Sequence, residues 1–288
     1  MNILWVSDEP GWAYDVNAKA LSLNMPQHNH HFIYTCQQGP EGVGAIIDKM
    51  DVIVAMNPAG FYMYRNFDKV FSILDTVRAI GDSDQNIFPK VKGIICNNQF
   101  LFDFAKDQNE NILLQPNGLD LNYFKPKQSD REFTMGFAGN INGPYADYKG
   151  WTLYQEAMEY LPDVKQESVL YGESRVDTDR MVPDFYHKID CLILASINEG
   201  CSNVITEALA CGIPVICTKI GFHGEALEHN KQCLFIERNI ESIKSAIQYM
   251  KLHSTHVNQM KIQARSFACI NHDIKKVAQN YSDFLEKR

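Results

Sequence analysis

Short apolar stretches rich in β-branched residues alternate with longer amphipathic stretches along the whole chain. An alternation of this kind predicts βα units and therefore parallel sheets, because each strand needs a crossover before the next one. In the first half, the pattern predicts strands at residues 2–6, 31–35, 52–56, 70–74, 93–97 and 112–115. The helices predicted between them lie at residues 16–23, 42–49, 58–66 and 98–106.

The pattern starts again in the second half, after a segment rich in turn-forming residues between Pro116 and Pro126. It predicts strands at 133–138, 167–171, 191–195, 214–217 and 233–235, and helices at 152–160, 179–187, 203–211, 240–252, 255–267 and 272–286. The chain therefore favours an α/β fold of two Rossmann-like, doubly wound domains with ligand sites at the strand ends, facing a cleft. We expect a first domain over residues 1–125, a second over 126–271, and a C-terminal helix over 272–288 that packs back on the first.

Composition and charge exclude several classes of partner. The 288 residues are 45% apolar and 22% charged, with a net charge of −8. Residues 1–130 hold ten Lys/Arg and fifteen Asp/Glu (net −5), and residues 131–288 hold seventeen and twenty (net −3). Because neither half is basic, we expect no nucleic-acid binding and no strong membrane association. The longest apolar runs have about seven residues, whereas a membrane-spanning helix needs roughly 20.

Cysteine and histidine spacing argues against a metal site. The eight cysteines include no C-x-x-C pair and lie mostly in apolar stretches, which is typical of buried reduced thiols. His28, His30 and His31 are clustered, but no Cys or Asp lies near them at ligand spacing. The N-terminus lacks the basic region of a signal peptide. We therefore expect a cytoplasmic protein.

The most specific chemical signal is a pair of glutamates, Glu199 and Glu207, eight positions apart. Between them, Ser202 is a good N-cap for a helix over residues 203–211. The first amides of this helix, at Asn203 and Val204, would face the loop, where a helix N-terminus attracts phosphate. Glu207 would lie in the first turns, where a carboxylate can accept from the two hydroxyls of a ribose. An ordinary strand–loop–helix unit with two solvent-facing glutamates is the alternative interpretation.

The whole string from Glu199 to Ile216 resembles the E-x7-E signature of retaining glycosyltransferases of GT-B fold, close to glycosyltransferase family 4. Residues 117–126 (NGLDLNYFKP) resemble the interdomain segment of that family, residues 133–139 its first strand of the second domain, and Lys149-Gly150 the K-G that follows. The resemblance implies two Rossmann-like domains facing a cleft. It also implies a nucleotide-sugar donor held by the second domain and an acceptor held by the first.

The same resemblance implies a role for each matching residue. Lys149 would pair with the donor diphosphate and stabilise the leaving group, Glu199 would hold the sugar hydroxyls, and Glu207 would hold the ribose. The other donor-binding positions are Gly200, Cys201 and Ser202 along the sugar, Asn203 and Val204 with amides on the phosphate, and Gly11 in the glycine loop of the first domain. Lys149 and the helix amides neutralise the diphosphate, so we expect no metal and no cofactor beyond the nucleotide-sugar substrate.

Two positions depart from the family pattern. The family has an arginine just after the first strand of its second domain, where this chain has Asn140, and Arg175 is the candidate to supply the missing cation. Gly11 is followed by Trp12 and Ala13 instead of a second glycine, and the first domain is short for the family. These departures motivate an alternative, a nucleotide- or sugar-binding module that has lost catalysis.

Weaker signals concern the acceptor and the base. Asp75 follows the predicted strand 70–74 and should point into the cleft. The resemblance implies a polar residue near this position that faces the sugar or acceptor, so Asp75 is the third candidate catalytic residue, with Lys149 and Glu199. Glu173 and Asp177 should flank the base. Guanine presents donors at N1 and N2 for carboxylates and uracil only one, which slightly favours GDP over UDP. The D-x-D at residues 82–84 matches the metal motif of the other large glycosyltransferase fold, and we interpret it as a surface loop.

The expected function is that of a retaining glycosyltransferase. It would move a hexose, mannose or glucose, from a nucleotide sugar to a glycan or other hydroxylated acceptor. Besides the degenerate binding module, another GT-B enzyme such as a sugar-nucleotide epimerase is the remaining alternative.

Overall fold

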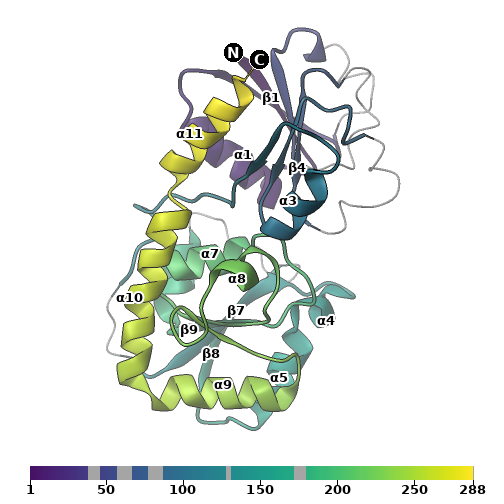
Figure 1. Cartoon of the computed structure of the whole chain (residues 1–288). Coiled ribbons are helices and arrows are strands. Elements are labelled where there is room, and N and C mark those ends of the chain that lie inside the picture. Colours follow the sequence, from purple (N-terminus) through teal and green to yellow (C-terminus); the bar gives the residue numbers. More distant parts are fainter. Residues whose placement is uncertain (38–45, 57–66, 77–86, 128–130, 172–179, 288) are drawn as a thin grey trace. The chain divides into compact units, whose positions relative to one another are not determined.

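The computed structural model of the chain describes all residues except 38–45, 57–66, 77–86, 128–130, 172–179 and 288. The chain forms two compact units (Figure 1). The first consists of Met1–Leu119 together with His272–Arg288, and the second of Asp120–Asn271. The first break therefore falls at Leu119, ahead of the predicted position after residue 125, and the C-terminal segment belongs to the first unit.

The first unit is built on a six-stranded parallel sheet with the order β2-β1-β3-β4-β5-β6. Its described elements are β1 (Asn2–Ser7), α1 (Ala13–Leu23), β2 (Asn29–Tyr34), β3 (Val52–Ala55), β4 (Val70–Leu74), β5 (Gly93–Cys96), α3 (Gln99–Ala105), β6 (Ile112–Leu114) and α11 (Ile274–Leu285). Figure 1 shows α11 running beside α1.

Side chains of this sheet alternate between two apolar layers. Ile3 and Trp5 pack in the layer that contains α1 and α11. Leu4 and Val6 pack in the layer that contains α3. Because successive residues of a strand point to opposite faces, a strand covered on both sides needs apolar residues at every position. The buried strands therefore appear in the sequence as continuous apolar runs.

The order of the strands reverses at β1. The chain first adds β2 on one side of β1 and then adds β3 on the other, so that Ile3 lies opposite both His30 and Val52. In open α/β sheets, ligands bind beyond the carboxyl ends of the strands at such a switch point. The edge beyond β1 and β3 is therefore where a ligand of this unit is expected.

The second unit is built on a five-stranded parallel sheet with the order β11-β10-β9-β7-β8. Its described elements are β7 (Thr134–Asn140), α4 (Tyr145–Lys149), α5 (Trp151–Glu159), β8 (Lys165–Tyr171), α6 (Met181–Asp184), the 3-10 helix η4 (Tyr186–Lys188), β9 (Cys191–Leu194), α7 (Asn203–Ala210), β10 (Val215–Cys217), α8 (Gly221–Ala226), β11 (Cys233–Phe235), α9 (Ile240–Leu252) and α10 (Ser254–Asn271). Helix α7 packs beside α10, and α5 beside α9 (Figure 1).

The chain returns to the first unit at a buried histidine. His272 is fully buried, and its Nδ1 lies 2.7 Å from the carbonyl oxygen of Asn117. Burial lowers the pKa of His272 to about 4, so the ring is neutral and Nδ1 donates to that carbonyl. The Leu119 amide donates to the His272 carbonyl at 2.9 Å, and Asp273 then caps α11 by accepting from the Lys275 amide. These bonds hold the start of α11 against the end of the first sheet.

The structure corrects one predicted helix and adds two helices that were not predicted. Helices α4 and α8 were not predicted, because helices this short owe their stability to packing and leave no periodic pattern. The prediction of one continuous helix over 179–187 is wrong. The chain forms α6 and η4 there, and Phe185 between them has non-helical backbone angles, with φ −130° and ψ −68°. The helix predicted at 58–66 and residues 42–45 of the helix predicted at 42–49 lie outside the described residues.

Candidate functional site

The loop between β9 and α7 carries Glu199 and packs against the start of α8. The amide of Phe222 donates to the carbonyl oxygen of Gly200 at 2.7 Å. Gly221 permits this approach, because its φ is 56° and a Cβ there would lie 2.4 Å from the carbonyl oxygens of Glu199 and Gly200. The left-handed backbone and the close contact both require glycine at this position.

Replacing Gly221 with alanine should destabilise the fold. Left-handed backbone costs a non-glycine residue about 1 kcal/mol, and the displaced turn adds to this, so we expect a total loss of roughly 2–4 kcal/mol. Urea unfolding measures the change. Gly143 is the matched control, because its φ is 53° but nothing lies within 4 Å of its Cβ position. Equal losses for Gly221→Ala and Gly143→Ala would contradict the packing argument.

Lys149 and Glu199 form an ion pair in the second unit. The Lys149 Nζ lies 2.6 Å from Glu199 Oε1, and the same oxygen accepts from Ser196 Oγ at 2.7 Å. The two charged side chains are only 23% and 13% exposed, so solvent screens them less than a surface pair. Behind Lys149, a Cβ on Gly150 would lie 2.5 Å from the Ala195 carbonyl oxygen. The end of α4 therefore sits directly on the end of β9.

A second cation, Arg238, supports the same region. It lies between β11 and α9, and its Nε donates to the carbonyl oxygen of Ala195 at 3.1 Å. Its Nη2 pairs with Asp147 Oδ1 of α4 at 2.9 Å. Arg238 thereby ties α4, and with it Lys149, to the end of β9. Sequence reasoning missed this residue because it belongs to no motif.

Helix α7 begins at the predicted cap. The side chain of Ser202 accepts from the Ile205 amide, which confirms the N-cap prediction. Thr206, in the first turns, donates to the Ser202 carbonyl at 3.0 Å, and its Oγ1 lies 3.1 Å from Nε2 of the buried His223. This contact attaches α8 to the first turns of α7. Since the first amides of a helix have no acceptor within it, the N-terminus of α7 directs positive potential at the loop that carries Glu199.

Glu207 is bound by a tyrosine that sequence reasoning missed. Its Oε2 accepts from the hydroxyl of Tyr186 at 2.6 Å. Burial raises the pKa of Glu207 to about 7, and the bond from Tyr186 partly offsets this effect. Burial and the nearby Glu207 charge raise the pKa of Tyr186, so its hydroxyl keeps the proton that it donates. In the sequence, Tyr186 is indistinguishable from an apolar core residue.

The other predicted donor-binding residues lie in several different parts of the chain. Cys201 is buried, with its Sγ 3.9 Å from Thr206 Oγ1. Asn140 ends β7, and its side chain accepts from the Asn142 amide at 2.9 Å. Gly11 belongs to the first unit, where φ is 75° and its amide donates to Asp15 Oδ2 at 2.6 Å. Glu173, Arg175 and Asp177, as well as the D-x-D at residues 82–84, lie outside the described residues.

Metal-ligating side chains do not gather in the part of the chain that the structure describes. Two of the clustered histidines instead make bonds within the first unit. His28 Nε2 lies 2.9 Å from Ser282 Oγ, and His30 Nδ1 accepts from Trp5 Nε1 at 3.1 Å. All eight cysteines are free thiols. No described helix has both the length and the apolar character that crossing a membrane requires.

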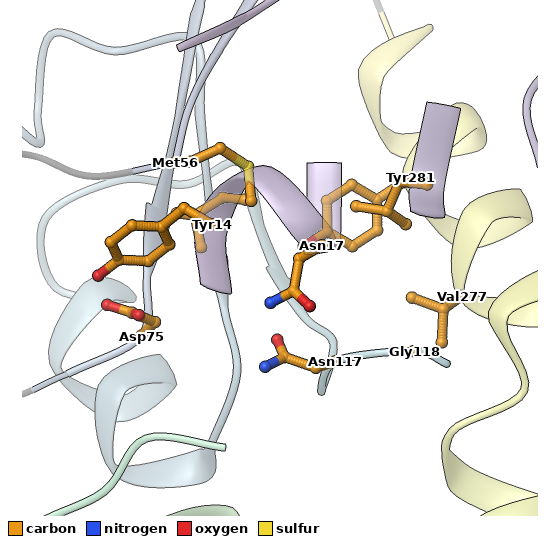
Figure 2. Close-up of a pocket in the computed structure, with 10 residues that line it drawn as sticks. Tyr14, Asn17, Met56, Asp75, Asn117, Gly118, Val277 and Tyr281 are labelled. Atoms are coloured by element: carbon orange, nitrogen blue, oxygen red, sulfur yellow. The ribbon is translucent and has the colours of Figure 1, made fainter. Parts of the chain in front are cut away.

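Asp75 lines a small pocket in the first unit. It follows β4, and the pocket wall also includes Tyr14, Asn17 and Asn117 (Figure 2). Tyr14 donates a hydrogen bond to Asp75, and burial together with the Asp75 charge raises the pKa of Tyr14. The phenol therefore keeps its proton.

Comparison with known protein families finds a match within the second unit. Residues 151–267 match the family Glycosyl transferases group 1. This range contains Glu199 and Glu207, and Lys149 lies just ahead of it. No curated protein matches the chain. The chain thus carries a glycosyl transferases group 1 domain, and the prediction of a glycosyltransferase enzyme is confirmed.

Solved structures resemble the chain over its whole length. Anabaena HepE in complex with UDP and glucose has a TM-score of 0.78 at 17% identity and covers 100% of both chains. Sucrose-phosphate synthase from Thermosynechococcus elongatus has a TM-score of 0.76 at 13% identity and covers 98% of both. A glycosyltransferase from Rickettsia africae has a TM-score of 0.72 at 14% identity, covering 100% of this chain and 99% of that one. Identities this low show the fold, which confirms the predicted GT-B class with two Rossmann-like domains.

Proposed function

We propose that the protein transfers a hexose from a nucleotide sugar to a hydroxylated acceptor such as a glycan, with retention of the anomeric configuration and without a metal ion. The observation that supports this most is the Lys149 ammonium, held 2.6 Å from Glu199 in the loop that leads to α7. A cation and a helix N-terminus at one loop provide two sources of positive potential for a diphosphate. The group 1 domain over residues 151–267 supports the proposal of sugar transfer.

The Lys149–Glu199 pair suggests how the donor is received. The diphosphate takes the place of Glu199 beside Lys149, and Glu199 is then released to accept from the sugar hydroxyls. Lys149 next stabilises the charge that develops on the leaving nucleotide, which is usually the largest electrostatic contribution to catalysis. Glu207, an acceptor when ionised, takes the ribose hydroxyls. With these groups the diphosphate is neutralised by the protein itself.

The identity of the donor rests on two different observations. Glu173 and Asp177 support a GDP sugar, with mannose or glucose as the hexose. The structures of Anabaena HepE with UDP and with UDP-glucose support a uridine donor instead. The free thiols support a reducing, cytoplasmic location for the reaction.

A binding module without catalysis is the second candidate function. Asn140 stands where the family has an arginine, and its side chain is engaged by the Asn142 amide. Measuring slow donor hydrolysis in water separates the two functions, because hydrolysis needs working stabilisation of the leaving group. A protein that binds the donor without hydrolysing or transferring it would be the degenerate module.

Thermal unfolding with UDP, GDP, ADP and their hexose conjugates tests the donor proposal. We expect one nucleotide to raise the midpoint by several degrees, since a ligand at about 100 times its Kd stabilises by about 2.7 kcal/mol. Added Mn²⁺ should leave the shift unchanged. Glu207→Gln should reduce it, whereas Glu228→Gln, which changes an exposed carboxylate of the same unit, should not. Absence of a shift with every nucleotide would contradict the proposal, and a shift that requires Mn²⁺ would contradict its metal-free part.

A further inference from the structure

The short helix α4 carries Lys149 with little support of its own. All five of its residues are described, and none of them is buried. Pro144 at its N-cap has no polar side-chain atom to bind the first amides of the helix. Isolated helices shorter than about 12–15 residues are marginal in water, so a helix of this length is held by its surroundings. The position of the Lys149 side chain therefore depends on contacts that reach α4 from elsewhere in the unit.

Arg238 supplies one of these contacts, although it lies 91 positions from Asp147 in the sequence. Its Nε donates to the Ala195 carbonyl oxygen, just after β9, at 3.1 Å. Its Nη2 donates to both the carbonyl oxygen and the carboxylate of Asp147 in α4. Because the guanidinium is planar, its donors have fixed directions relative to one another. Arg238 therefore sets the spacing between α4 and the end of β9.

The geometry of this contact matters more than its charge. Asp147 is 68% exposed, and an ion pair with an exposed partner contributes no more than about 1 kcal/mol. Arg238 itself is only 26% exposed and bonds two backbone carbonyl oxygens, which belong to α4 and to the residue that follows β9. Bonds to the main chain hold the elements themselves, whereas the exposed carboxylate adds little.

Donor binding makes this anchor more important. In the proposed mechanism the diphosphate replaces Glu199 beside Lys149, so Lys149 loses the partner that fixes its ammonium in the unliganded protein. The contacts of α4 then decide where the ammonium lies when charge develops on the leaving nucleotide. A misplacement of about 1 Å in a catalytic group can cost about 10²-fold in rate.

We propose that Arg238 is a positioning residue of the transfer reaction and holds α4 so that Lys149 faces the leaving diphosphate. The inference rests on the proposed transferase function and assigns a role to a residue outside the E-x7-E and K-G motifs. Arg238 acts through Lys149 and not by contact with the donor.

Single-turnover hydrolysis and transfer of UDP-glucose or GDP-mannose, whichever donor the thermal shifts select, test this role. We expect Arg238→Ala to slow the chemical step about fivefold and to change the nucleotide Kd by less than about twofold, because the α7 amides remain. Arg238→Lys should recover little of the rate, since an ammonium keeps the charge but cannot donate in two fixed directions. In a Lys149→Ala background, Arg238→Ala should cause no further loss, because a residue that acts through Lys149 then has nothing to position.

Arg131→Ala is the matched control. Arg131 is also 26% exposed, donates to the carbonyl oxygen of His187 at 2.8 Å, and pairs with Asp190 at 3.4 Å. Arg131 and Asp190 precede β7 and β9, whereas Arg238 bonds a residue that follows β9. Arg131→Ala should therefore lose stability in urea unfolding, as Arg238→Ala does, yet keep the rate of the parent protein.

Hydrogen exchange of the α4 amides provides a readout that does not depend on activity. Arg238→Ala should speed exchange over residues 145–150 severalfold, and Arg131→Ala should not. Four results would each overturn the inference: unchanged exchange, the parent rate in Arg238→Ala, full recovery with Arg238→Lys, or equal rate losses with and without Lys149. A parent protein that neither hydrolyses nor transfers the donor would instead defeat the proposed function, even where exchange shows that Arg238 holds α4.

Discussion

Replacing Lys149 with alanine should lower the turnover of sugar transfer by about 10²–10³-fold, because removing one preorganised group that stabilises developing charge costs about that much. Nucleotide affinity should change far less, since the amides at the start of α7 remain. Single-turnover measurements with saturating donor separate the chemical step from binding. The ion pair with Glu199 explains why this lysine is already in place before the donor binds.

Lys231→Ala is the matched control for this variant. Lys231 lies in the same unit, is 56% exposed and pairs with Glu228 at the surface, so its loss should leave turnover unchanged. In the Lys149 variant, the partly buried Glu199 loses its charged partner and keeps the hydrogen bond from Ser196. Urea unfolding shows whether this loss destabilises the fold. Full turnover in a folded Lys149→Ala protein would remove the role assigned to this residue.

Donor affinity should rise with pH through the neutral range. The pKa of Glu207 is about 7, and its ionised form is the better acceptor for ribose hydroxyls. The ionised fraction then increases about tenfold between pH 6 and pH 8, and the nucleotide Kd should fall by about the same factor. Isothermal titration across this range measures the change.

The stability of the unliganded protein should follow the opposite trend. Between the ordinary glutamate pKa of 4.5 and the value of about 7 in the folded protein, the folded state keeps a proton that the unfolded state has lost. The Glu207 contribution to stability therefore decreases as pH rises through this window. Subtracting the pH profile of Glu207→Gln from that of the parent isolates this contribution. A parent and a Glu207→Gln variant with the same pH dependence in both assays would contradict the assignment.

Two tyrosine variants provide the matched pair for this experiment. Tyr186→Phe removes the hydrogen bond that lowers the pKa of Glu207, so the midpoint of the binding profile should move to higher pH. Tyr154→Phe also removes a buried hydroxyl of the same unit, but that hydroxyl has no partner in the described part of the chain. The profile of Tyr154→Phe should match that of the parent protein.

Local patterns were sufficient to predict most of the fold. β4 (Val70–Leu74) and α9 (Ile240–Leu252) have the predicted bounds, because a strand buried on both faces and an amphipathic helix each leave a complete local signal. The cap at Ser202 was predictable for the same reason, since a cap bonds within its own first turn. The spacing of Glu199 and Glu207 was likewise visible, as it lies in one strand–loop–helix unit.

The sequence by itself thus determined the class of fold, the succession of strands and helices, and the loop that carries the two glutamates. Only the tertiary structure decided which groups meet there. Lys149 reaches Glu199 across 50 positions of the chain and Tyr186 reaches Glu207 across 21. Asp75 shares its pocket with α11, and the whole second unit lies between them along the chain. Such contacts depend on strand order and on how helices pack, and no local periodicity encodes them.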